Sequence, residues 1–133
     1  MTFGLGINTI SVLCLALSAL IHLLPLGGVL GARQLRKLYG MDFSDTNLAL
    51  LMRHRAVLFG LIGGILLYSC IVVAARPLAI TVGLVSVVSF LALARLHHSY
   101  SAAIRKIVIA DYVALVLLLV AALNEALQPL SEG

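Results

Sequence analysis

The sequence predicts an all-α integral membrane protein, a bundle of four transmembrane helices with one short additional helix. Of its 133 residues, 62% are hydrophobic and 11% are charged, whereas an ordinary soluble domain is about half apolar and about a quarter charged. A soluble fold this small buries too little of its surface to hide so many apolar side chains. The apolar residues also form four runs, each about as long as the roughly 20 residues that a spanning helix needs.

The four predicted spans cover residues 3–26, 48–75, 77–96 and 102–127. Pro25 and the glycine pair after it mark the end of the first span, and Pro77 suits the first turn of the third. We expect the first run to be retained as a helix rather than cleaved as a signal peptide, because no basic segment precedes it. The expected organisation is a single transmembrane domain over residues 1–133.

The connector between the first and second spans carries an amphipathic segment. Its apolar side chains share one helical face and its basic side chains the other, with Leu35, Leu38 and Tyr39 opposite Arg33, Arg36 and Lys37. This pattern predicts a short helix lying in the membrane interface. Gly40 should end that helix, and Ser44 or Asp45 should cap the next span.

Basic residues lie on one side of the predicted bundle. Eight of the nine Lys and Arg residues flank the first and third connectors, and only Arg76 flanks the second. The positive-inside rule therefore predicts that these two connectors are cytoplasmic and that both termini are outside. We expect a multi-pass protein of a bacterial inner membrane, with membrane lipids as partners. Because the basic residues sit in short connectors, the net charge of +4 does not indicate a nucleic-acid partner.

Small residues predict one close helix contact. Ala56, Gly60 and Gly64 recur every four residues and form a face on which another helix can approach closely. Packing within one protomer is the favoured interpretation, and a homo-oligomer interface is the alternative. Cys14 and Cys70 fall inside apolar runs, which favours two buried thiols over a redox pair.

Polar residues inside the spans are costly and usually face the interior of a bundle. In the first span, Asn8, Ser11, Ser18, His22 and Pro25 follow a heptad stripe that faces neighbouring helices. In the fourth span an acidic residue lies at about the same depth in the membrane as His22, about 7–8 Å deeper than Lys106. This residue is Asp111, and its expected partners at that level are His22, His54, Arg55, His97 and Arg105.

These residues predict a polar site at the cytoplasmic end. His22 and Asp111 are the candidate catalytic residues and the expected floor of the site. The candidate ligand-binding residues are Arg53, His54, Arg55, His97 and Arg105. Ser86 and Ser89 share a face of the third span with His97. The alternative for the arginines is a role in topology, reaching lipid phosphates, and the alternative for Asp111 is a structural ion pair.

The leading functional hypothesis is a site that binds, or acts on, a lipid-like or amphipathic small molecule. A second use is metal binding through His22, His54, His97 and Asp111, but no HxxxH or ExxH spacing supports it, and we assign no metal. A third is a small proton-coupled transporter with Asp111 as the titrating group. A structural subunit of a membrane complex is the remaining alternative. The sequence does not decide whether the protein is an enzyme, and it assigns no cofactor.

Three stretches carry a resemblance to a known group. Residues 21–39 (IHLLPLGGVLGARQLRKLY), 47–58 (NLALLMRHRAVL) and 108–113 (VIADYV) resemble small bacterial four-helix membrane proteins that are broadly similar to the DoxX-like group. The resemblance implies the four-helix fold and brings no catalytic motif. Some similar sequences are labelled phosphopantetheine adenylyltransferase, a soluble enzyme class with an HxGH motif. His22 is followed here by Leu-Leu-Pro and the chain has no HxGH, so we reject that activity.

Overall fold

A computed structural model describes residues 2–128, with side chains described from Asn8 onward. All regular secondary structure in this range is helical, with no strand. The elements are α1 (Thr2–Leu23), η1 (Leu24–Leu30), α2 (Ala32–Tyr39), α3 (Thr46–Ile71), η2 (Val73–Ala75), α4 (Arg76–Leu96) and α5 (Ala102–Leu127). Within the described range, four helical stretches are long and apolar enough to cross a membrane. The prediction of four membrane-length helices is confirmed.

Two helix ends differ from the prediction. The first α-helix stops at Leu23, not at residue 26, and a 3₁₀ segment continues the rod to Leu30. Pro25 lies in the first turn of that segment, where its missing N–H breaks the α-helical ladder. The second span was predicted to reach residue 75, but α3 ends at Ile71 because Val72 is extended, and η2 turns the chain into α4.

The connector between the first two long helices is ordered by local contacts. Asp45 caps α3, since its carboxylate accepts from the backbone N–H groups of Asn47 and Leu48 at 2.8 and 3.4 Å. Gly40 ends α2 in the left-handed conformation, with φ of 64°, which glycine adopts without steric cost. The amphipathic pattern of α2 is present: Leu35 and Tyr39 are buried against the protein, and Arg36 and Lys37 are exposed.

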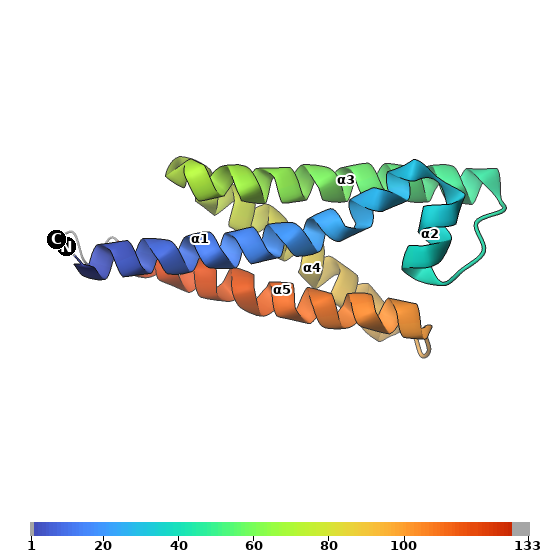
Figure 1. Ribbon diagram of the computed structural model, residues 1–133. Helices are drawn as coiled ribbons and strands as arrows, with labels where there is room; N and C mark the ends of the chain where they lie inside the picture. Colours follow the sequence, from blue (N-terminus) through green and yellow to red (C-terminus); the bar gives the residue numbers. More distant parts are fainter. Residues whose placement is uncertain (1, 129–133) are drawn as a thin grey trace.

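The long helices run roughly along one axis (Figure 1). The α3–α4 turn lies at the same end as the start of α1 and the end of α5, and we call this the hairpin end. Helix α2 and the 97–101 loop lie at the other end, the basic end, where α2 runs across the bundle axis (Figure 1). Helix α4 begins beside α3 at the hairpin end and crosses toward α5, so α3 and α4 diverge toward the basic end (Figure 1).

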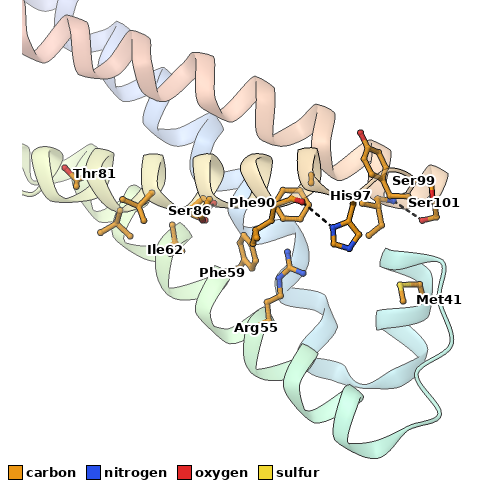
Figure 2. Close-up of a pocket in the computed structure, with 17 residues that line it drawn as sticks. Met41, Arg55, Phe59, Ile62, Thr81, Ser86, Phe90, His97, Ser99 and Ser101 are labelled. Atoms are coloured by element: carbon orange, nitrogen blue, oxygen red, sulfur yellow. Dashed lines mark hydrogen bonds between the residues drawn. The ribbon is translucent and has the colours of Figure 1, made fainter.

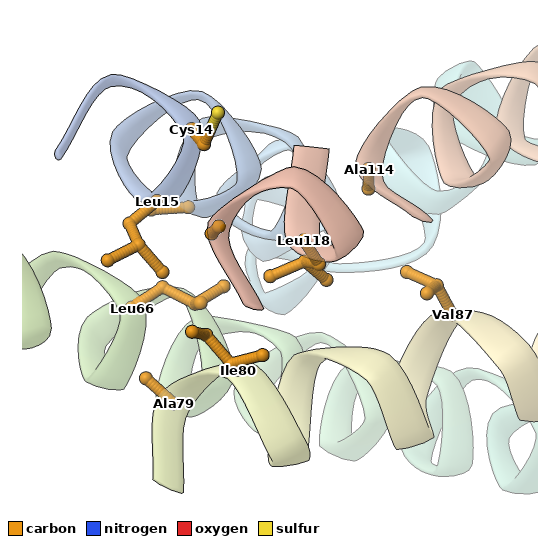
Figure 3. Packing of buried hydrophobic residues seen from close by; sticks show 10 residues of the cluster. Cys14, Leu15, Leu66, Ala79, Ile80, Val87, Ala114 and Leu118 are labelled. Atoms are coloured by element: carbon orange, nitrogen blue, oxygen red, sulfur yellow. The ribbon is translucent and has the colours of Figure 1, made fainter. Parts of the chain in front are cut away.

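An apolar layer fills the centre of the bundle. Leu15 of α1, Leu66 of α3 and Leu118 of α5 are each fully buried, and Ile80 of α4 packs with them (Figure 3). Ser11, Ser18 and His22 are buried on the same stripe of α1 as Leu15, so the middle of the predicted stripe faces the interior, whereas Asn8 at its start is exposed. The layer separates the buried polar groups of one end from those of the other.

The close contact between α1 and α3 uses a different glycine from the predicted one. Ala56 is buried, and a Cβ added at Gly60 would lie 2.6 Å from Leu26 Cδ1. Packing of Gly64 within the protomer, the favoured interpretation, was wrong, because a Cβ added there would meet nothing within 4 Å. Gly63 packs instead, and a Cβ there would lie 2.6 Å from Leu23 Cγ and 3.2 Å from the Ala19 carbonyl oxygen. Adjacent helix positions differ by about 100° in direction, so only one of the two glycines can face α1.

Candidate functional site

The divergence of α3 and α4 leaves a cavity of about 900 Å³ toward the basic end. Figure 2 shows the side chains that line it. Most of its wall is apolar, formed by Phe59, Ile62, Val82, Val85, Phe90 and Leu93. Its polar groups include His97, Ser99 and Ser101 at the basic end, Arg55 midway along, and Ser86 and Ser89 along α4 (Figure 2). We call this cavity the groove.

Arg55 lies among three aromatic rings. Its guanidinium carbon is 5.2 Å from the ring centre of Phe59, 5.5 Å from that of Phe90 and 5.8 Å from that of Tyr39. Each is a cation–π distance, and together the rings hold the charge in a largely apolar setting. The two ion pairs among the residues with described side chains, Arg36–Asp42 and Arg76–Glu125, do not involve Arg55. Its charge can therefore serve a ligand.

Tyr39 packs against Arg55 from the short helix α2. Burial raises the pKa of its phenol, and the positive charge of Arg55 partly opposes that shift. The phenol is therefore protonated at neutral pH and remains a hydrogen-bond donor.

A second, smaller cavity of about 60 Å³ lies on the other side of Arg55. Its wall includes His22, Tyr39, Arg55, Phe59 and Asp111. The structure thus brings His22 and Asp111 to one cavity, at the common level expected from the sequence. This cavity is beside the groove rather than at its floor. The side chains of Arg55 and Phe59 line both cavities and stand between them.

His22 is almost fully buried, with 2% of its surface exposed. Its Nδ1 lies 2.8 Å from the Ser18 carbonyl oxygen. A carbonyl oxygen can only accept, so Nδ1 carries a proton, and in the neutral imidazole Nε2 is an acceptor. Within the described part of the chain, neither Nε2 nor the Ser18 hydroxyl has a hydrogen-bond partner. One turn of α1 therefore holds two unsatisfied polar atoms.

The other predicted site residues are more dispersed. His97 lines the groove, with Nδ1 3.4 Å from the Leu93 carbonyl oxygen. His54, Arg53 and Arg105 are exposed and line neither cavity. Arg53 donates from Nε to the Val29 carbonyl oxygen at 2.9 Å, which ties α3 to η1.

The four residues weighed as metal ligands lie apart: His22 and Asp111 line the small cavity, His97 lines the groove, and His54 is exposed. Among the described residues, no three His, Cys, Asp or Glu side chains come together in a group that could hold a metal ion.

The sequence analysis missed the three rings around Arg55. A helical signal was present for two of them. Phe59 follows Arg55 by four residues, a spacing that places both on one side of a helix. Phe90 follows Ser86 by four residues and precedes His97 by seven, so it shares the face that the sequence assigned to those two residues.

The sequence analysis also missed a polar cluster at the hairpin end. Arg76, which it treated only as the one basic residue outside the basic end, is 1% exposed. It donates to Glu125 at 3.0 Å, to the Asn8 side-chain oxygen at 2.7 Å and to the Ser69 carbonyl oxygen at 3.2 Å. The Ser11 hydroxyl also donates to Glu125, at 2.6 Å. The cluster joins all four long helices. Its signal was the separation of Asp111 and Glu125 by two heptads, which places both carboxylates on one face of α5.

Four apolar helices of this length define a multi-pass membrane protein. Its distinctive feature is a mainly apolar groove that contains one arginine, with a small polar cavity on the other side of that arginine. Comparison of the chain with protein-family models, curated proteins and solved structures finds no match. The function must therefore be inferred from the two cavities.

Proposed function

We propose that the protein binds an amphipathic, lipid-like molecule in the groove between α3 and α4. The apolar body of the ligand lies along Phe59, Val85 and Phe90, and its anionic or polar head lies at Arg55 and His97. The supporting observation is the arrangement of the groove. Its wall is mainly apolar, and its only arginine has no ion-pair partner among the residues with described side chains.

The size and lining of the groove fit this class of ligand. A volume of about 900 Å³ falls within the range of about 300–1,000 Å³ that is usual for small-molecule pockets. Lipid tails are as apolar as this wall, so the wall contributes shape and van der Waals contacts, and the contact of the head with Arg55 supplies most of the selectivity. The Arg55 guanidinium, which is partly buried and lies among three aromatic rings, then fixes the orientation of an anionic head.

Binding, rather than catalysis, is the function that we propose. The groove places Arg55 and His97 near the ligand head, but the acid–base candidates His22 and Asp111 line the other cavity. A reaction at those two residues would need the side chains of Arg55 and Phe59 to move aside.

A blocking substitution tests the groove directly. Ser86→Trp places a large ring in the groove, and we expect native mass spectrometry from mild detergent to show loss of the non-protein mass that the unaltered chain retains. Val88→Trp is the matched control, because Val88 is half exposed on the same helix and does not line the groove. Retention of the same mass by both variants would place the ligand elsewhere, and its absence from the unaltered protein would count against the proposal.

We further propose that the basic end faces the cytoplasm of a bacterial inner membrane, with α2 in the membrane interface and both termini outside. The supporting observation is that eight of the nine Lys and Arg residues flank the first and third connectors, because basic residues are enriched on the cytoplasmic side. In a background without Cys14 and Cys70, the thiol of the His98→Cys variant should react with an impermeant thiol reagent only in inside-out vesicles. Reaction only in right-side-out vesicles would reverse the assignment.

A small proton-coupled transporter is the second candidate. The observation that favours it is the presence of inward-facing ionisable groups at both ends, the buried Asp111 and His22 at one and the buried Arg76 with the partly buried Glu125 at the other. The central layer of Leu15, Leu66 and Leu118 closes the path between them in this structure. The transporter therefore predicts that the thiol of the Asp111→Cys variant reacts from both sides of the membrane, and groove binding alone predicts reaction from one side at most.

A further inference from the structure

The small cavity beyond Arg55 holds buried polar groups that the proposed binding function leaves unused. His22 Nε2 has no hydrogen-bond partner within the described chain, and its side chain is 2% exposed. Asp111 is 7% exposed, and among residues 8–128 its carboxylate takes part in neither ion pair. A buried carboxylate with no compensation is strongly disfavoured, so it is either balanced by a nearby cation or protonated.

The cavity has room for water. Its volume is about 60 Å³, and one water occupies about 30 Å³ of liquid. A water molecule has two donor hydrogens. It can donate one to Nε2 of His22 and the other to the Asp111 carboxylate. The polar wall of the cavity is thus suited to hydrogen-bonded water that carries protons between these two side chains.

The charged and titratable groups around this cavity come from four helices. They are His22 of α1, Tyr39 of α2, Arg55 of α3 and Asp111 of α5. Helix α4 contributes no residue to its wall, and the titratable groove residues after α4 are His97 and Tyr100. Arg55 is therefore the only permanent cation facing the cavity, and it faces the groove as well.

This shared arginine connects the two cavities electrostatically. While the groove is empty, the guanidinium of Arg55 is the nearest cation that can balance an ionised Asp111. When an anionic head binds Arg55, that charge is shared between two anions. The buried carboxylate then loses part of its compensation, and protonation restores it.

We propose that the His22–Asp111 cavity is a proton-binding site linked through Arg55 to anion binding in the groove. This inference rests on the proposed function, because it requires the anionic head to bind at Arg55. For each anionic ligand bound, one proton is taken up from water and held at Asp111 or shared with His22, so that charge is conserved at the site. By reciprocity, the affinity for the anion rises as the pH falls, by up to about tenfold per pH unit.

The probe for this linkage is a fluorescent alkylsulfonate, whose head keeps its negative charge at all accessible pH values. Its dissociation constant is measured in nanodiscs of zwitterionic lipid from mildly acidic to mildly alkaline pH. For the unaltered protein we expect the dissociation constant to increase with pH, by up to about tenfold per unit. For Asp111→Asn we expect a constant value close to the low-pH value of the unaltered protein, because the amide resembles the protonated acid. His97→Asn should retain the pH dependence.

A dissociation constant that does not change with pH in the unaltered protein would overturn the linkage, as would an equal pH dependence in Asp111→Asn. Failure of the groove itself gives a different result, namely no binding at any pH or no effect of Ser86→Trp. In that case infrared spectroscopy of the ligand-free protein decides on the proton site alone. A carboxylic C=O band that grows as the pH falls and is missing in Asp111→Asn supports the site, and its absence at every pH refutes it.

Discussion

Glu125→Gln is expected to lower the free energy of unfolding by about 3–5 kcal/mol, the usual cost of leaving one member of a buried ion pair alone. Its partner Arg76 is 1% exposed. Among the residues with described side chains, Glu125 is the only carboxylate that forms an ion pair with Arg76. The substitution keeps the shape of the side chain but removes the counter-charge. The Asn8 and Ser69 oxygens would still accept from Arg76, but they are neutral. Reversible unfolding in mixed micelles measures the loss.

A double variant separates the effect of leaving Arg76 without a counter-charge from the effect of lost packing. Arg76→Met combined with Glu125→Gln removes both charges, and we expect it to be less destabilised than the sum of the two single variants. Arg36→Ala is the control for losing an arginine from an ion pair, since Arg36 and Asp42 are both largely exposed, and we expect little change. If the effects of the two single variants simply add, then Arg76 and Glu125 do not depend on each other for stability.

Arg55→Met is expected to weaken binding of an anionic amphiphile by about ten- to a hundredfold, because a hydrogen bond to a charged group contributes roughly 1.5–3 kcal/mol. Arg55 is the only arginine that lines the groove, and its guanidinium lies among three aromatic rings. A ligand head placed there has no other permanent cation to replace it. Fluorescence titration with the alkylsulfonate in zwitterionic nanodiscs measures the change.

Arg53→Met is the matched control for Arg55→Met. Arg53 lies two residues away on the same helix, but it is exposed and lines neither cavity. We expect its replacement to leave the affinity almost unchanged. Arg55→Lys keeps the charge without the planar donor geometry. Its affinity for the amphiphile should lie between those of Arg53→Met and Arg55→Met. Equal losses in Arg53→Met and Arg55→Met would indicate a general surface charge effect and would count against a specific head-group site.

Much of the candidate site could be anticipated from the sequence, but not how its parts are divided. The heptad stripe on α1 and the position of Asp111 on α5 predicted that His22 and Asp111 meet at one level, and both line one cavity. The separation of that cavity from the groove depends on where the side chains of Arg55 and Phe59 lie between them. Their position follows from contacts with α2 and α4, which no pattern within α3 alone specifies.

The sequence by itself determined the class of protein and the number and approximate extent of its long helices. A bilayer requires each spanning segment to satisfy its own backbone hydrogen bonds, so long apolar runs become helices wherever they later pack. It also determined which stripe of α1 faces inward, because buried polar residues at heptad spacing have no other favourable position.

Only the tertiary structure decided how the helices cross and which neighbours each face meets. The crossing of α4 toward α5 opens the groove (Figure 1). Gly63 rather than Gly64 meets α1, since one residue turns a side chain by about 100°. The turn between α3 and α4 brings Arg76 inward to Glu125, where the surrounding helices bury it. Each of these contacts joins residues far apart in the chain, and local periodicity carries no information about such pairs.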